Sequence, residues 1–314
     1  MAKTLKELKE QDFQIETCGT NSIILKRADY AYKITREYST VQATEIMKEI
    51  NTLEAYNIAI PKAFGVDEVA FSSPSDFNNA ISMVMSSDGK IDWKKIAPIV
   101  NNTIGESAYI LPMLKYQFVY GESLFSDKRL GGLNLINRNE CFRNCEKLHP
   151  QIKEMLEKDL VPNLALFEEM DSQIMYKFLT DGELILRTGI TIDNHTCENF
   201  IYGVADGVKA IYYIDIGGLE RMATHKEFGE RNLFGFTIDN MCRMIYINTT
   251  ADLGELKTRQ RGVFNKISDT LKTFLDNNPN CLQQFDEYMQ RDNYFKKLKM
   301  SLNTGSPENQ VQPN

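Results

Sequence analysis

Several residue types and patterns are scarce or missing in this chain of 314 residues, which has three histidines and one tryptophan. Its six cysteines form no CxxC pair and no Cys/His cluster with zinc-ligand spacing, so we do not predict a zinc module. No run of about 18 apolar residues occurs, and the charged first ten residues do not resemble a cleaved secretion signal. We therefore expect reduced thiols, no integral membrane segment and a cytoplasmic location, in the producing cell or in a host cell that receives the protein.

The overall composition is that of a folded globular protein. Apolar residues make up 42% and charged residues 25% of the chain, which argues against wholesale disorder. There are 43 acidic and 36 basic residues, giving a formal charge of −7, so a general electrostatic grip on nucleic acid is not expected. The length allows two lobes, each with its own apolar centre.

The first 120 residues are expected to form a lobe built on a β-sheet. Residues 13–17, 23–27 and 30–35 are rich in β-branched and aromatic residues, which favours strands. Ser39 or Thr40 can cap a helix running to Tyr56, the main helix expected in the sheet lobe. Residues 1–10 are interpreted as a short charged helix or a frayed end, and residues 93–100 are compatible with a short helix. The apolar run Ala80–Met85 is interpreted as a further strand, and the lobe ends near Tyr120.

Residues 121–300 are expected to form a mainly helical lobe interrupted by one β feature at 190–220. There, residues 199–204 and 209–215 flank Asp206-Gly207, a pair typical of a tight hairpin turn. Residues 301–314 have little apolar content and are predicted to be a disordered tail. The predicted helices cover residues 137–148, 151–160, 164–179, 254–276 and 281–300.

Parts of the chain predict a site for a nucleotide's phosphates. Phosphoryl transfer needs a cradle for the phosphates, a lysine to hold them and oxygen ligands for magnesium. The small-residue loop 18–22, which includes Gly19 and Thr20, lets backbone N–H groups approach phosphates. Lys33 on the following strand supplies a point charge, and Glu49 on the next helix can pair with it.

The expected hairpin carries two candidate metal ligands. Asn199 opens it and Asp215 closes it, so both side chains are expected at the same end of the ribbon. Amide and carboxylate oxygens suit a hard cation such as Mg²⁺ or Mn²⁺. The order of these features predicts an ATP site with a divalent ion: first the loop, then the lysine, the glutamate, the asparagine and the aspartate.

This order resembles the protein-kinase-like superfamily, which includes protein kinases and the aminoglycoside- and choline-kinase-type enzymes. Residues 30–34 are similar to the lysine strand of that superfamily, and residues 49–53 are similar to the helix that supplies the lysine's glutamate. The segment 118–124 resembles the hinge, which implies cofactor contacts at Val119, and residues 214–217 resemble the magnesium-binding segment. The resemblance implies an α+β, bilobal fold with a β-rich N-terminal lobe, a mainly helical C-terminal lobe and ATP- and Mg-dependent kinase activity.

The segment 193–199 resembles the catalytic loop, with one departure. The superfamily's aspartate stands five positions before the asparagine, where this chain has Asn194, and Asp193 comes one residue earlier. A one-residue bulge would bring Asp193 into place as the group that accepts or orients the acceptor hydroxyl. Without it, the protein is a pseudokinase that binds a nucleotide or a partner, and nucleotidyl transfer on the same fold is a further alternative.

The acceptor is not specified by the sequence. A protein, a small molecule or a lipid hydroxyl remain open, and the divergence of the motifs is similar to that of specialised branches such as bacterial effector kinases. The basic residues of the last two expected helices are either a solvated face or a pocket for a phosphorylated ligand. These residues are Lys257, Arg259, Arg261, Lys266, Lys296, Lys297 and Lys299.

Overall fold

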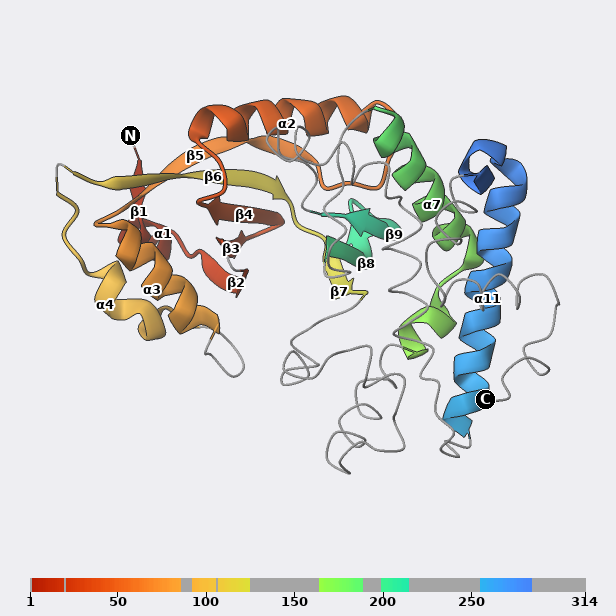
Figure 1. The fold of residues 1–314 in the computed structure, drawn as a ribbon. Helices are drawn as coiled ribbons and strands as arrows, with labels where there is room; N and C mark the ends of the chain where they lie inside the picture. The colour runs from red at the N-terminus through yellow and green to blue at the C-terminus, as the bar shows by residue number, and fades with distance from the viewer. Residues whose placement is uncertain are drawn as a thin grey trace, which may run out of the picture. The chain divides into compact units, whose positions relative to one another are not determined.

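The computed structural model describes residues 2–19, 21–85, 92–105, 107–124, 164–188, 199–214 and 255–283 (Figure 1). These residues divide into two compact units. The first holds the residues up to Tyr120 together with Val204–Val208, and the second holds the others. The expected helices at 137–148 and 151–160, the catalytic-loop residue Asp193 and the tail 301–314 lie outside the described residues.

The first unit is built on a six-stranded sheet with the order β1-β5-β6-β4-β3-β2. The short β1 runs parallel to β5, and the other neighbouring strands are antiparallel. The predictions of strands at 13–17, 23–27 and 30–35 are confirmed. The strands are β1 (Lys3–Thr4), β2 (Gln14–Cys18), β3 (Ser22–Arg27), β4 (Tyr30–Thr35), β5 (Ala63–Phe71) and β6 (Tyr109–Gln117).

One face of this sheet carries the main apolar core of the unit. Side chains alternate along each strand, so Ile23 and Leu25 of β3 share a face with Tyr32 and Ile34 of β4, and all four are buried. Apolar residues of the short helices pack on this face, and Figure 1 shows α3 and α4 on the side of the sheet away from α2. The helices are α1 (Leu5–Glu10), α3 (Pro74–Met85), η1 (Trp93–Ile96) and α4 (Ala97–Val100).

Helix α3 corrects the expected strand at Ala80–Met85. Phe77, Ala80, Ile81 and Val84 recur at helical spacing, and all four are buried in the core. Their burial against the sheet favours a helix over a strand, although the apolar run alone was compatible with either. The sheet lobe therefore contains α3 in addition to the helices expected within residues 1–10, 39–56 and 93–100.

The opposite face of the sheet is covered by α2 (Thr40–Glu54). Ser39 caps this helix, because its Oγ accepts a hydrogen bond from the backbone N–H of Gln42 at 3.3 Å, while Gln42 Oε1 accepts from the N–H of Ser39 at 2.9 Å. Ala43 and Met47 of α2 pack with Leu114 of β6. The helix predicted to begin at Ser39 or Thr40 is confirmed.

The predicted hairpin is also confirmed. Most of its two strands belongs to the second unit, whereas its turn, Val204–Val208, is grouped with the first. Strands β7 (Tyr120–Ser123), β8 (Phe200–Ala205) and β9 (Val208–Tyr213) form a sheet in that order. Asp206 and Gly207 both have positive φ, 49° and 76°, as a two-residue turn between twisted strands requires.

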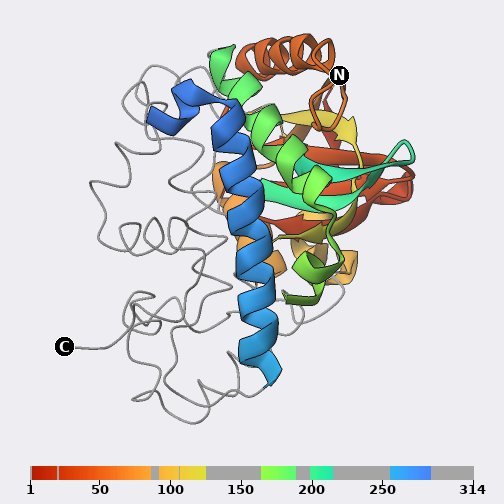
Figure 2. The ribbon, with the colours of Figure 1, turned by 90° about the vertical axis from the view of Figure 1, so that its right-hand side faces the viewer.

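Helices α7 (Ser172–Arg187) and α11 (Glu255–Asn277) pack side by side in the second unit (Figure 2). The helix expected over 164–179 is interrupted at Met170 and Asp171, because the Asp171 side chain accepts a hydrogen bond from the N–H of Gln173 at 2.8 Å and so caps α7. Phe178 of α7 stacks on Tyr213 with ring centroids 4.7 Å apart, and Phe200 meets Tyr213 edge-on at 5.3 Å.

Within the described residues, no helix combines the length and apolar character needed to span a membrane.

Candidate active site

Lys33 lies on β4, a central strand of the first sheet, on the face that α2 covers. It is opposite Ile24 of β3 and Leu114 of β6 in the strand register, and directly opposed residues share a face. Leu114 packs against α2, so the Lys33 side chain starts on the same face. That side chain is only 12% exposed, which places its ammonium in a partly desolvated environment.

The loop between β2 and β3 lies at the same end of the sheet as Lys33. The N–H of Gly19 donates to the carbonyl of Ser22 at 2.9 Å and closes this loop. Ser22 is opposite Thr35 in the register, two positions beyond Lys33 on β4. A Cβ atom at Gly19 would meet Ser22 Oγ at 3.5 Å, an ordinary contact, and Thr20 lies outside the described residues.

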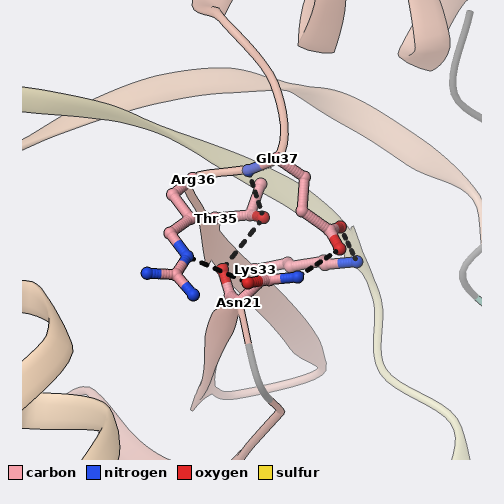
Figure 3. A network of polar contacts seen from close by, with 5 residues as sticks. All are labelled: Asn21, Lys33, Thr35, Arg36 and Glu37. Carbon is pink, nitrogen blue, oxygen red and sulfur yellow. Dashed lines mark hydrogen bonds and ion pairs between the residues drawn. The ribbon is translucent and has the colours of Figure 1, made fainter. Parts of the chain in front are cut away.

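The carboxylate beside Lys33 is that of Glu37. Lys33 Nζ and Glu37 Oε2 are 3.6 Å apart, and both side chains are mostly buried. Asn21 Nδ2 donates to Glu37 Oε1 at 3.2 Å, and the backbone N–H of Glu37 donates to Thr35 Oγ1 at 3.1 Å. Figure 3 shows Asn21, Lys33, Thr35, Arg36 and Glu37 as one polar network.

Glu49, the predicted partner of Lys33, lies half-buried on α2. Burial raises the pKa of the Glu49 carboxyl, and the neighbouring carboxylate of Glu45 raises it further. Among the described side chains, no ion pair joins Glu49 to Lys33. The orienting role of Glu49 stays a prediction.

Val119 follows β6 at the end of the first unit and is buried. The preceding N–H of Phe118 donates to the carbonyl of Asp29 at 2.8 Å, which ties this segment to the β3–β4 turn. Lys26 Nζ lies 4.0 Å from the ring centroid of Phe118 and 4.5 Å from that of Tyr120, a cation–π arrangement that orders the segment further. Cofactor binding by Val119 stays a prediction.

The two ends of the hairpin in the second unit lie opposite each other. The carbonyl of Asn199, just before β8, accepts a hydrogen bond from the N–H of Ile214 at 2.9 Å, just after β9. The Asn199 amide oxygen is of the type that Mg²⁺ takes. Asp215 follows Ile214 in the sequence but lies outside the described residues, as does Asp193. Within the described ranges, no three His, Cys, Asp or Glu side chains cluster as a metal site would require.

Two of the basic residues considered for a phosphate pocket are engaged within the second unit. Arg259 donates to both carboxylate oxygens of Glu168, at 2.8 and 2.6 Å, and these hydrogen bonds lower the pKa of the Glu168 carboxyl. Lys266 Nζ donates to the carbonyls of Phe167 and Glu168, both at 3.1 Å. These contacts give Arg259 and Lys266 a structural role that joins α11 to the segment before α7.

Comparisons with known proteins give a distant structural similarity. No protein-family model matches the chain, and no curated protein matches it in sequence. A point variant of aminoglycoside 2′-phosphotransferase IIIa in complex with GDP is 13% identical, with 94% of each chain covered and a TM-score of 0.27. The GDP complex of the wild-type enzyme is also 13% identical, with 96% of this chain and 94% of that chain covered and a TM-score of 0.27.

Because both TM-scores lie far below 0.5, the fold assignment depends on the chain's own element order. The lysine strand β4 leads into α2, and α2 leads into β5 in the same sheet. A helical unit with one β-hairpin follows. The expected α+β class, with a β-rich N-terminal part followed by helices and a β-hairpin, is confirmed in the described residues.

Neither Glu37 nor the role of Asn21 was predicted from the sequence. Residues four apart on an extended strand are about 13 Å apart, so the spacing of Lys33 and Glu37 indicates no contact. The available signal was the end of the alternation of apolar and polar residues after Thr35. There the strand ends and the chain bends, so Glu37 is not on an extended strand.

Proposed function

We propose that this protein is an ATP- and Mg-dependent phosphotransferase, a kinase acting on a hydroxyl group of a protein, a small molecule or a lipid. The position of Lys33 carries this proposal. Its mostly buried ammonium lies on a central strand, on the face covered by α2 and at the end of the sheet that bears the Gly19 loop. A partly desolvated cation near the end of the sheet that bears a small-residue loop suits a phosphate.

Each predicted residue has a role in this reaction. Lys33 holds the α- and β-phosphates, the backbone at Gly19 and Thr20 approaches them, and Val119 contacts the nucleotide. Glu49 remains the proposed helix-borne partner of the lysine. The remaining roles belong to Asn199 and Asp215 as ligands of Mg²⁺ or Mn²⁺, and to Asp193 as the base.

The transfer itself requires little covalent work from the protein. The acceptor hydroxyl oxygen forms a bond to the γ-phosphorus, the bond to the bridging oxygen breaks, and ADP leaves. Asp193 orients the hydroxyl and receives its proton. A bound Mg²⁺ would neutralise negative charge on the phosphates.

Labelled nucleotides separate this function from its two alternatives. Transfer of label from [γ-³²P]ATP to an acceptor or to the protein itself supports the kinase. Transfer of label from [α-³²P]ATP supports nucleotidyl transfer on the same fold. Saturable binding of MgATP with neither transfer supports a pseudokinase. This alternative is favoured by Asn194, which stands where the superfamily's catalytic loop has its aspartate.

Asp215→Ala serves as the inactive variant in the labelling experiment. We expect Asp215→Ala to abolish transfer of either label, because it removes the proposed carboxylate ligand of the metal. The melting temperature should change by only a few degrees. Unchanged turnover in this variant would contradict the mechanism.

A further inference from the structure

We propose that Glu37 is the positioning residue for Lys33, and that Asn21 links this carboxylate to the loop proposed to bind the phosphates. The inference rests on the proposed function, because it concerns how the lysine of that site is directed. It adds Glu37 and Asn21 to the site, neither of which the motif pattern includes.

The bend after β4 brings Glu37 back to Lys33. The N–H of Arg36 donates to the carbonyl of Asn21 at 3.2 Å, and Thr35 Oγ1 lies 3.2 Å from the same oxygen. These bonds hold the end of β4 against the start of β3. The N–H of Glu37 then donates to Thr35 Oγ1, which turns the chain so that its carboxylate faces Lys33 Nζ at 3.6 Å.

Glu37 is fixed by groups other than Lys33, so the carboxylate can direct the lysine. Asn21 Nδ2 donates to Glu37 Oε1 at 3.2 Å, leaving Oε2, a buried atom, to face the ammonium. Asn21 is itself held, because its Oδ1 accepts from Arg36 Nε at 2.9 Å. Arg36 Nη1 also donates to Asn78 Oδ1 on α3 at 2.6 Å, which anchors the network to the helix.

The same asparagine belongs to the loop 18–22 that the proposed function places over the phosphates. One hydrogen-bonded network therefore fixes the position of the loop and the direction of the Lys33 side chain. A flexible lysine stem loses considerable conformational entropy when it is held in one direction. A fixed carboxylate orders part of the lysine side chain before the nucleotide binds. This reduces the entropy that binding itself must cost and so strengthens nucleotide binding.

The effect on nucleotide affinity distinguishes positioning from simple neutralisation of charge. Glu37→Gln keeps the shape of the side chain and removes its charge. We expect it to weaken binding of a non-hydrolysable ATP analogue with Mg²⁺ about tenfold by calorimetry, a change of about 1.4 kcal/mol. Asn21→Ala should weaken binding in the same direction, and Glu10→Gln, an exposed glutamate on α1, should not. Tighter or unchanged binding by Glu37→Gln would overturn the inference.

A second measurement tests whether Glu37 acts through Lys33. In a Lys33→Met background, Glu37→Gln should cause no further loss of affinity for the analogue. Without nucleotide, the melting-temperature changes of the two variants should not add in the double variant, because the residues are in contact. Additive changes in affinity or in melting temperature would contradict the assignment. Absence of binding by the wild type would instead refute the proposed function, and the inference with it.

Discussion

Lys33→Met is expected to lower kcat/KM for MgATP by about a hundredfold to a thousandfold, the loss typical when one preorganised group that stabilises charge is removed. Methionine keeps most of the apolar stem and removes the ammonium, which is only partly exposed in the folded protein. The measurement is steady-state transfer from [γ-³²P]ATP. A variant that kept more than half of the wild-type activity would show that the lysine does not serve the phosphates.

The stability of this variant must be followed beside its activity. Removing Lys33 leaves the carboxylate of Glu37 mostly buried without its cation, which costs free energy. We expect a melting temperature a few degrees lower and unchanged far-ultraviolet circular dichroism at the assay temperature. Lys33→Arg, which keeps the charge but changes its shape, should restore the stability more than the activity.

The second large effect is expected for Gly121→Ala in strand β7. A Cβ atom at Gly121 would lie 2.2 Å from the carbonyl oxygen of Tyr202 and 2.4 Å from the Cα of Gly203, both backbone atoms of β8. Neither can rotate away, so the two strands must separate. We expect a loss of about 3 kcal/mol in the free energy of unfolding, measured by urea denaturation.

Gly262→Ala on α11 is the matched control for that measurement. A Cβ atom at Gly262 would meet nothing within 4 Å, and alanine favours a helix over glycine by about 1 kcal/mol. The same chemical change should therefore destabilise at one site and stabilise at the other. Equal stabilities of the two variants would contradict the close approach of β7 to β8.

Local patterns predicted the elements whose structure depends on neighbours in sequence. β-branched and aromatic runs predicted β2, β3 and β4, Ser39 predicted the start of α2, and Asp206-Gly207 predicted the turn of the hairpin. For the start of α2 and the hairpin turn, the deciding hydrogen bonds or dihedral angles lie within a few residues.

Elements that depend on packing could not be predicted in this way. The run at Ala80–Met85 taken alone is compatible with a strand, and its helical spacing shows only when the preceding turn with Phe77 is included. Its apolar face then covers the sheet. Glu37, which contacts Lys33, accepts a hydrogen bond from Asn21 in the loop between β2 and β3, sixteen residues earlier. Spacing along the sequence indicates the lysine strand but not which carboxylate faces it.

The most direct test of whether the ammonium of Lys33 contacts a nucleotide's phosphates is a crystal structure with Mg²⁺ and a non-hydrolysable ATP analogue. We expect a phosphate oxygen within about 3 Å of Lys33 Nζ, with the backbone of residues 19–22 against the same phosphates. A nucleotide bound elsewhere, with Lys33 contacting no phosphate, would contradict it.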